Sequence, residues 1–405
     1  MSKVNKSIRD QYNKYPYPEP VKDMEEYLKV TNYESCPTLN SNLLWPTTGY
    51  PEKPFNILCA GCGSSEAVGL AMKNPLANVI GIDISNSSLS HSKSLKKKHK
   101  LANLTLKKLD LHQVESLGQK FDLIVSSGVL HHLPDPKTGF QALRKVLADD
   151  GSFTCMLYGK YGRVGVYMFQ ELAKLLDLKQ DDDSVSVLKE MCATVPALHP
   201  VKLVTDAFHD SKYDAGLVDL FLNPQDTAFS VKDIMQMADD TDFVFHTWLD
   251  NYLYYPQSLP VAQTQLFNKI SALPAQQQWE FMEKFTCAIP RHSFILTHPD
   301  RDPEDYAIDF NENTIDKYIP VWAPSTFVTS PLNMEPFGQV NYRRKKYDFA
   351  ANEYGAKLLG YMNGKNTAQK CIELARKALG NKELDFFPVF DYMYRAGHVQ
   401  MLIKK

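Results

Sequence analysis

The feature that most constrains the fold is an alternation of strand-like and helix-like segments from residue 55 to about 158. Apolar runs typical of strands occur at 55–60, 77–83, 103–110, 121–127 and 151–158, and amphipathic segments typical of helices lie at 66–73, 89–98 and 137–147. Strands that alternate with crossover helices build parallel sheets. This region therefore predicts an α/β fold with a doubly wound, Rossmann-like sheet.

The first predicted strand runs into a turn with two glycines and two cysteines, "NILCAGCGSS" at residues 56–65. A zinc site needs two ligands besides Cys59 and Cys62, and no second Cys-x-x-Cys or histidine pair with ligand spacing lies nearby. A redox pair needs an exposed first thiol, whereas Cys59 ends an apolar strand. A dinucleotide loop would place Glu66 at its third glycine position. We therefore expect no metal and disfavour a nicotinamide or flavin cofactor.

The same turn fits a nucleoside site, because it joins a strand to a helix N-terminus with free amides. Gly61 and Gly63 let the backbone approach a ligand closely. Asp83 follows Gly63 by 20 residues and ends the second predicted strand, where a carboxylate can accept both ribose hydroxyls. The alternative is that Asp83 only caps the next helix. Asp110, which ends the third strand, either accepts from an adenine amine or is a solvated strand-end residue.

Four motifs, "ILCAGCGSS", "VIGIDIS", "LKKLDL" and "FDLIVSSGVLHHLPDP", resemble class I S-adenosylmethionine-dependent methyltransferases in their order and spacing. The resemblance implies S-adenosyl-L-methionine as the cofactor and transfer of its methyl group to an acceptor. Ser65 and Cys59 depart from the family pattern. Cys59 replaces an acidic residue, so the methionine amino group needs other partners. The cofactor-binding residues that the resemblance implies are Ala60, Gly61, Gly63, Asp83, Ile84, Asp110, Leu111 and Ser126.

Weaker resemblances cover other parts of the chain. The segment "YNKYPYPEP" at 12–20 is similar to a lead-in that folds over the cofactor in bacterial methyltransferases. Tyr12 and Tyr17 then close the site, where an aromatic face favours a sulfonium; the alternative is a strap whose tyrosines pack on the domain. Residues 213–234 resemble an insertion of bacterial methyltransferases with a regulatory region, similar to rickettsial-type protein lysine methyltransferases. The last residues, 341–405, resemble PqqD-like winged-helix modules.

The acceptor side is less defined by the sequence. Methyl transfer is an in-line displacement, for which positioning dominates. His131 and His132 follow the fourth strand, at the edge where ligands bind in such sheets, and one of them is a candidate base; the alternative is that they pack or hydrogen-bond. Arg163 follows the fifth strand and either holds an acceptor carboxylate or anchors an insertion.

Length and composition suggest several domains. At 405 residues the chain exceeds one ordinary core. We predict a strap at 1–50, a methyltransferase domain at 51–256 with an insertion at about 160–227, a mixed helical region at 257–340 and a small winged-helix-like module at 341–405.

We expect a cytoplasmic protein without membrane or nucleic-acid partners. No apolar run reaches the length of a membrane span, the first residues lack a secretory signal, and seven cysteines, an odd number, suit reduced thiols. A net charge of −2 gives no general affinity for nucleic acid, and the short basic runs at 93–100 and 342–347 are interpreted as solvated faces. The sequence does not indicate an oligomeric state.

These features together predict a methyltransferase that acts on a nitrogen or oxygen nucleophile. The acceptor is a small molecule or a peptide. Two alternatives remain open: a protein lysine methyltransferase, and a scaffold that binds the cofactor without turnover.

Overall fold

The computed structural model of the chain describes residues 11–17, 20–30, 36–207, 209–259, 264–324, 326–327, 338–342, 345–349, 353–380 and 385–404. The chain forms two compact units, which we describe separately. The first comprises Met1–Thr38, Pro51–Leu249 and Trp279–Arg301, and the second comprises Leu39–Tyr50, Asp250–Gln278 and Asp302–Lys405. The division into four segments remains a prediction. A transmembrane helix requires about 20 apolar residues, and none of the helices in the described ranges meets that requirement.

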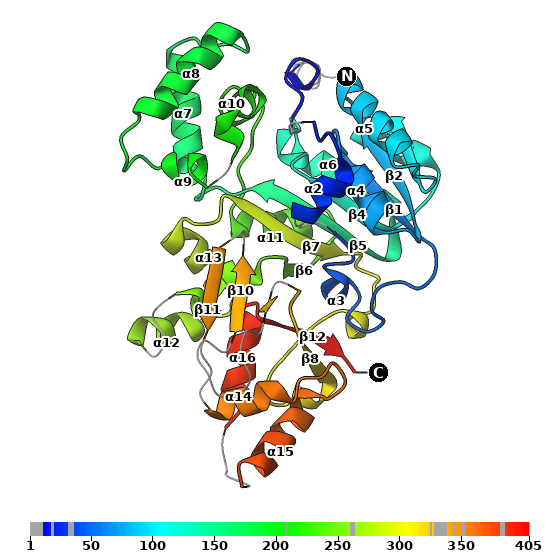
Figure 1. Ribbon diagram of the computed structural model, residues 1–405, viewed down its shortest axis with the longest axis vertical. Coiled ribbons are helices and arrows are strands. Elements are labelled where there is room, and N and C mark those ends of the chain that lie inside the picture. The colour runs from blue at the N-terminus through cyan, green and yellow to red at the C-terminus, as the bar shows by residue number, and fades with distance from the viewer. Residues whose placement is uncertain are drawn as a thin grey trace. The chain divides into compact units, whose positions relative to one another are not determined.

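A seven-stranded sheet with the order β3-β2-β1-β4-β5-β7-β6 organises the first unit (Figure 1). Strands β1 to β5 are parallel, and β7 runs antiparallel to both β5 and β6. The order in which strands are added to the sheet reverses between β1 and β4, and ligands bind at the carboxyl ends of open α/β sheets at such a point. The predicted doubly wound sheet is confirmed. Its strands are β1 (Phe55–Ala60), β2 (Ala77–Asp83), β3 (Leu104–Lys108), β4 (Phe121–Ser127), β5 (Leu147–Tyr158), β6 (Val244–Trp248) and β7 (Arg291–Thr297).

Polar side chains cap three of the crossover elements, α5, η1 and α6. The side chain of Ser85 accepts from the backbone N–H of Ser88, so helix α5 begins three residues before the predicted start. Asp135 caps α6, and Pro136 occupies its first turn, where proline is tolerated. These elements are α4 (Glu66–Lys73), α5 (Asn86–Lys98), η1 (Leu111–Leu117), η2 (Leu130–His132) and α6 (Pro136–Val146).

The far edge of the sheet was only partly predicted. Helix α11 (Val231–Asp240) starts with a capping box in which Ser230 and Asp233 satisfy each other's backbone N–H, as their identity and spacing in the sequence allow, and β6 follows it. Strand β7 separates β6 from β5, whereas the prediction for residues 257–340 was a mixed helical region. Helix α13 (Ala275–Thr286) leads into β7.

The helices that follow β5 have an apolar core of their own. Phe169 of α7 packs in this core with Leu188 of α8 and Leu217 of α10. A Cβ on Gly165 would lie 2.0 Å from the backbone nitrogen of Val201, so only glycine permits this close approach. The insertion comprises α7 (Val164–Leu175), α8 (Asp182–Thr194), α9 (Lys202–Thr205), η3 (His209–Lys212) and α10 (Asp214–Phe221).

The second unit contains the helices and the strand predicted near the C-terminus. Strand β12 (Val399–Ile403) pairs antiparallel with β8 (Tyr318–Trp322), and the N–H of Ile403 donates to the carbonyl of Pro46. The winged-helix-like class of this module remains a prediction. The other elements of the unit are α3 (Ser41–Leu44), η4 (Asn251–Tyr254), η5 (Pro256–Ser258), α12 (Gln265–Ser271), η6 (Pro303–Asp305), η7 (Ile315–Lys317), β9 (Thr326–Phe327), β10 (Gly338–Tyr342), β11 (Lys345–Phe349), α14 (Glu353–Gly360), α15 (Ala368–Ala378) and α16 (Phe387–Arg395).

Glu283 of α13 makes the stability of the first unit depend on pH. Its side chain is 2% exposed and accepts from the N–H of Val231. Burial raises its pKa from 4.5 to about 7. Because the folded state holds this proton more tightly, the contribution to stability is complete below pH 4.5 and is lost as the pH rises toward about 7.

We expect Glu283→Gln to reduce the loss of stability between pH 5 and pH 8 by about 2 kcal/mol. Chemical unfolding at both pH values measures this loss. Glu190→Gln, at an exposed carboxylate, is the control and should leave the loss unchanged. An equal loss in wild type and Glu283→Gln contradicts the prediction.

Candidate active site

The loop after β1 is a tight turn. Gly61 and Gly63 have φ angles of 75° and 53°, which residues with a side chain rarely adopt. A Cβ on Gly61 would lie 2.3 Å from a methyl carbon of Val129. The N–H groups of Gly61 and Cys62 both donate to the carbonyl of Ile82, at 2.9 Å. The glycines therefore hold the loop against the end of β2.

Asp83 organises this end of the sheet. Its carboxylate accepts the backbone N–H of Gly63 at 2.8 Å and that of Ser85 at 2.7 Å. Burial raises the pKa of Asp83, and these two hydrogen bonds act in the opposite direction. A carboxylate has about four lone-pair directions, so Asp83 can bind two backbone amides and still accept from a ligand.

The other predicted cofactor residues lie at the same edge of the sheet. The hydroxyl of Ser126 donates to the carbonyl of Ala60 at 3.1 Å and joins β4 to β1. Asp110 caps η1, and one of its oxygens lies 2.9 Å from Nδ1 of His112. Ile84 directly follows β2, and Leu111 begins η1. The sequence grouped these residues from four separate strands.

The N-terminal segment joins the sheet domain to the insertion. The side chain of Asn13 accepts from the hydroxyls of Ser85 and Ser87 at the start of α5. Ser87 also donates to the carbonyl of Tyr12. Tyr17 stacks on Tyr213, immediately before α10, with ring centroids 6.4 Å apart. Tyr12 therefore lies near the cofactor loop, whereas Tyr17 packs on the insertion.

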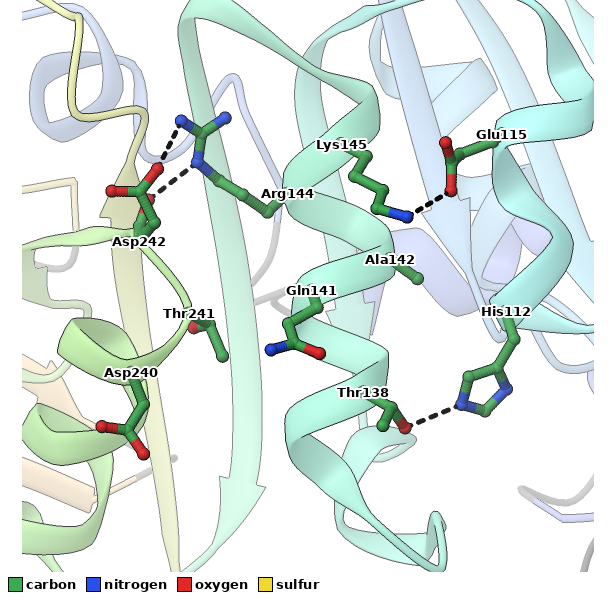
Figure 2. Close-up of a pocket in the computed structure, with 10 residues that line it drawn as sticks. All are labelled: His112, Glu115, Thr138, Gln141, Ala142, Arg144, Lys145, Asp240, Thr241 and Asp242. Atoms are coloured by element: carbon green, nitrogen blue, oxygen red, sulfur yellow. Dashed lines mark hydrogen bonds and ion pairs between the residues drawn. The ribbon is translucent and has the colours of Figure 1, made fainter.

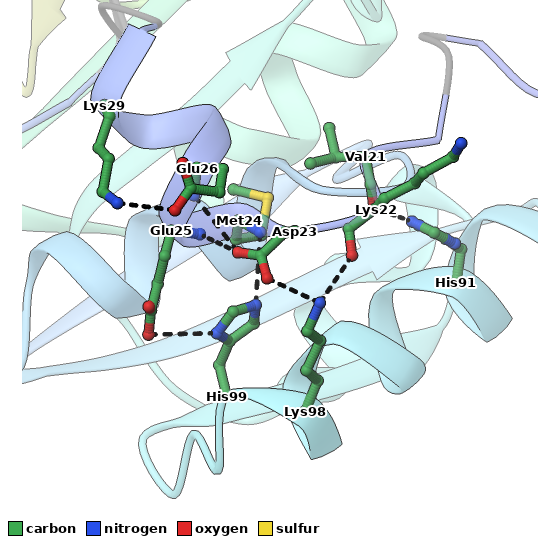
Figure 3. A network of polar contacts seen from close by, with 10 residues as sticks. All are labelled: Val21, Lys22, Asp23, Met24, Glu25, Glu26, Lys29, His91, Lys98 and His99. Atoms are coloured by element: carbon green, nitrogen blue, oxygen red, sulfur yellow. Dashed lines mark hydrogen bonds and ion pairs between the residues drawn. The ribbon is translucent and has the colours of Figure 1, made fainter.

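A second attachment holds this segment at the other end of α5 (Figure 3). Lys98 pairs with Asp23 at 2.8 Å and donates to the carbonyl of Lys22, while His91 contacts the carbonyl of Val21. The hydrogen bond from Lys98 lowers the pKa of Asp23 to about 2. Helix α2 (Met24–Val30) starts at this attachment. Both ends of α5 thus contact the N-terminal segment.

Asp219 of α10 lies at the centre of a buried polar group. The hydroxyl of Tyr12 donates to its Oδ1 at 2.9 Å, and that of Tyr158, the last residue of β5, donates to its Oδ2 at 3.2 Å. Asn223 donates to Oδ1 at 3.4 Å. Asp219 is 1% exposed, and burial raises its pKa. We call Asp219 and its neighbours Tyr12, Tyr158, His131, His132, Arg163 and Asp226 the Asp219 cluster.

Arg163 pairs with a carboxylate inside the protein. One of its terminal nitrogens lies 3.4 Å from Oδ2 of Asp226, and both side chains are buried. The guanidinium carbon lies 3.6 Å from the ring centroid of Tyr158. Gln170 also donates to Asp226. This arrangement corresponds to the anchoring role that the sequence left open for Arg163.

The two adjacent histidines have different surroundings. His131 is fully buried, and its ring stacks on Tyr158 at 3.8 Å. Neither of its ring nitrogens has a hydrogen-bond partner in the described part of the chain. Burial, with the charges of His132 and Arg163, holds the pKa of His131 well below its usual value. Nδ1 of His132 lies 2.7 Å from the carbonyl of Gln225. A carbonyl only accepts, so this nitrogen carries the proton and Nε2 of the neutral ring has the lone pair.

A hollow of about 500 Å³ lies elsewhere on the first unit, between η1, α6 and the end of α11 (Figure 2). Its charges are paired with each other: Lys145 with Glu115 and Arg144 with Asp242, at 2.8 and 2.9 Å. None of the residues of the Asp219 cluster lines it. We therefore place the active site at the carboxyl ends of β1, β2, β4 and β5.

Comparison with known proteins decides the class of the domain. Residues 52–194 match a family model described as a methyltransferase domain. The chain carries a class I S-adenosylmethionine-dependent methyltransferase domain. Its fold is similar to that of PKMT2 from Rickettsia typhi, solved alone and in complex with AdoHcy, with TM-scores of 0.63 and 0.62 and 17% identity over 92% of this chain and 76% of the other. An uncharacterized protein from Synechococcus sp. is 26% identical over 303 residues, 72% of either chain.

The residues of this methyltransferase fit its cofactor. Asp83 offers remaining lone pairs to ribose hydroxyls, and the buried hydroxyl of Ser64, in the same loop, has no hydrogen-bond partner among the residues that the structure describes. A buried polar atom without a partner is costly, and a polar ligand at the loop can supply one. Cys59 and Cys62 are fully buried, and burial raises the pKa of both thiols, which disfavours metal-binding thiolates.

Three residues of the site in this methyltransferase, Tyr158, Asp219 and Asp226, were not predicted from the sequence. Asp219 lies in the run "GLVDLF", where one acid interrupts an otherwise apolar stretch, 216–221, whose residues are all buried. Charged residues are almost never fully buried unless they are paired. That interruption was the available signal.

We expect Asp83→Asn to weaken AdoHcy binding by about 10- to 100-fold, because hydrogen bonds to a charged group contribute about 1.5–3 kcal/mol. Isothermal titration calorimetry measures the affinity. Asp122→Asn is the control: Asp122 lies on β4 and accepts from the N–H of Asn56, next to β1 but away from the loop. Equal affinities for wild type and Asp83→Asn contradict the assignment.

Proposed function

We propose that the protein transfers the methyl group of S-adenosyl-L-methionine to a nitrogen or oxygen nucleophile that binds beside the Asp219 cluster. The observation that carries the proposal is the position of this cluster. His131 and His132 directly follow β4, Tyr158 ends β5, and Tyr12 connects them to the loop of Asp83 through Ser87. Burial at this edge excludes water from the reaction.

Each part of the site has a distinct role in this proposal. The cofactor supplies an electrophilic methyl group when it is bound. Asp83 holds its adenosine half, the glycines of the Gly61–Gly63 turn let the backbone approach it, and Asp110 lies at the adenine. Tyr12 covers the site from the N-terminal segment. The acceptor atom must lie about 3–3.5 Å from the methyl carbon and in line with the departing sulfur, so the main task of the chain is positioning.

His132 is the group that we assign to proton removal. Its Nδ1–H is bound to the carbonyl of Gln225, so Nε2 is available to accept a proton from the nucleophile. No comparable hydrogen bond among the described residues orients the ring of His131. Its low pKa keeps it neutral, and its stacking on Tyr158 makes it a positioning residue.

A peptide or protein amine is the acceptor favoured by the resemblance of residues 213–234 to rickettsial-type protein lysine methyltransferases. The fold similarity to PKMT2 over 92% of the chain is consistent with it. A small-molecule acceptor fits the enclosed position of Asp219 equally well. A scaffold without turnover has less support, because it does not explain a buried carboxylate at the end of β5, on the acceptor side of the sheet.

Incubation with methyl-labelled cofactor and fractionated lysate tests the proposal. We expect label in one fraction, and its size separates a small molecule from a protein. Mild base identifies a carboxylate acceptor, because methyl esters are hydrolysed whereas methyl ethers and methylamines are not, and mass spectrometry of the labelled product separates those two. Protein with Asp83→Asn is the matched control and should transfer much less label. If wild-type protein binds AdoHcy and labels no fraction, the scaffold alternative is correct.

The two histidines give a second prediction. His131→Phe should retain transfer within about threefold with an unchanged pH profile, because phenylalanine preserves the stacking on Tyr158. His132→Gln should lower the rate about 10²- to 10⁴-fold, the usual contribution of a general base. Initial rates of label transfer from pH 6 to 9 measure both effects. A loss in His131→Phe as large as that in His132→Gln rejects this division of roles.

A further inference from the structure

We infer that the acceptor is an amine that enters as an ammonium ion and pairs with Asp219. This inference rests on the proposed function and names the substrate class of the same site. It follows from the hydrogen bonds of one carboxylate, from the charges around it and from its place on the sheet.

One lone-pair direction of the Asp219 carboxylate remains without a hydrogen-bond donor. Tyr12, Asn223 and Tyr158 supply three hydrogen bonds, and a carboxylate accepts about four. Among the described residues, no lysine, arginine or histidine nitrogen forms an ion pair with Asp219 within 4.0 Å. A charge this deeply buried is costly unless it is paired. A ligand with a positive charge removes that cost.

The neighbouring ion pair does not neutralise Asp219. Arg163 and Asp226 pair with each other and cancel. Burial holds the pKa of His131 well below its usual value, so His131 adds no charge. Asp219 is the carboxylate of the cluster that has no ion pair among the described residues, so a cation is the ligand that complements it.

The surroundings of Asp219 favour an ammonium over other cations. The hydroxyl of Tyr12 donates to Asp219, and the centroid of the Tyr12 ring lies 6.4 Å from that of His132. The ring of Tyr158 is already covered by His131 and by the guanidinium of Arg163, so the aromatic contact is assigned to Tyr12. Aromatic rings attract alkylammonium ions. An ammonium has only donors, which matches a carboxylate and the lone pair at Nε2 of His132. A carboxylate acceptor would be repelled by Asp219.

The cofactor also carries an ammonium on its methionine half, so the position of Asp219 matters. The adenosine-binding groups, Gly63 and Asp83, lie at the ends of β1 and β2. Asp219 is bound to Tyr158 at the end of β5, which is separated from β1 by β4. This is the side of the sheet on which we place the acceptor.

The proposed transfer conserves atoms and charge with the acceptor, His132 and the methyl group of the cofactor. The ammonium loses one proton to Nε2 of His132, and the neutral amine attacks the methyl carbon. The new N–C bond forms as the C–S bond breaks, and the electron pair of that bond remains on sulfur. The product is a methylammonium ion, which can still pair with Asp219, and the proton on His132 is released to solvent.

The experiment measures binding of n-butylamine, n-butanol and butyrate to the full chain saturated with AdoHcy at pH 8, by calorimetry. We expect n-butylammonium to bind at least tenfold more tightly than n-butanol, with no detectable binding of butyrate. Asp219→Asn should remove this preference and change AdoHcy affinity by less than about twofold. Asp214→Asn, at an exposed carboxylate that begins the same helix, should behave as wild type.

Three results overturn the inference: n-butanol binds as tightly as the amine, Asp219→Asn keeps the preference, or Asp219→Asn weakens AdoHcy as much as the amine. The third assigns Asp219 to the methionine ammonium instead. AdoHcy-induced thermal shifts report whether Asp219→Asn folds. If it does not, Asn223→Ala is used: it removes the most distant of the three donors, at 3.4 Å, and should bind n-butylammonium as tightly as wild type or more tightly, and loss of the preference rejects the inference.

Failure of the proposed function has a different signature. In that case no lysate fraction receives label, while AdoHcy and n-butylammonium both still bind. Label transfer to a fraction combined with equal binding of n-butanol and n-butylamine rejects only the ammonium inference.

Discussion

The active site depends on the hydrogen bonds that converge on Asp219. Tyr12 and Asp219 are 207 positions apart in the chain, and Tyr158 and Asp219 are 61 apart. The two tyrosines bring the N-terminal segment, the sheet and the insertion to one carboxylate. Because the carboxylate is buried, removing one donor costs more than an exposed hydrogen bond does. The three segments therefore form one site only when all are in place.

Two buried aspartates give this site its polarity. Asp83 accepts backbone amides of the loop that it stabilises, so its geometry is fixed by local chain folding. Asp219 accepts side-chain hydroxyls from distant segments, so its geometry depends on how the insertion packs. Burial raises the pKa of both groups. A carboxylate held by local chain folding, such as Asp83, suits a cofactor that all members of a family share. A carboxylate positioned by the insertion, such as Asp219, can vary with the acceptor.

The same difference explains what the sequence could predict. The bounds of β1, β2 and β4 were read from local apolar runs, and Asp83 from its distance to the glycine loop. Strand β7 was missed because a strand between β5 and β6 is defined by its partners, which lie over 40 residues before it. Asp219 was missed because its partner Tyr12 belongs to a segment with no sequence link to α10.

His131 and His132 mark the limit of reading function from a motif. The sequence offered both as candidate bases because both follow β4. In the structure, the loop after α10 supplies Gln225 to His132 and, through the N–H of Thr227, holds the carbonyl of His131. The ring of His131 stacks on Tyr158, and neither of its nitrogens has a hydrogen-bond partner among the described residues. In the proposed assignment, one distant loop thus gives two adjacent histidines different roles. Choosing between them as the base requires the packed insertion and not the motif alone.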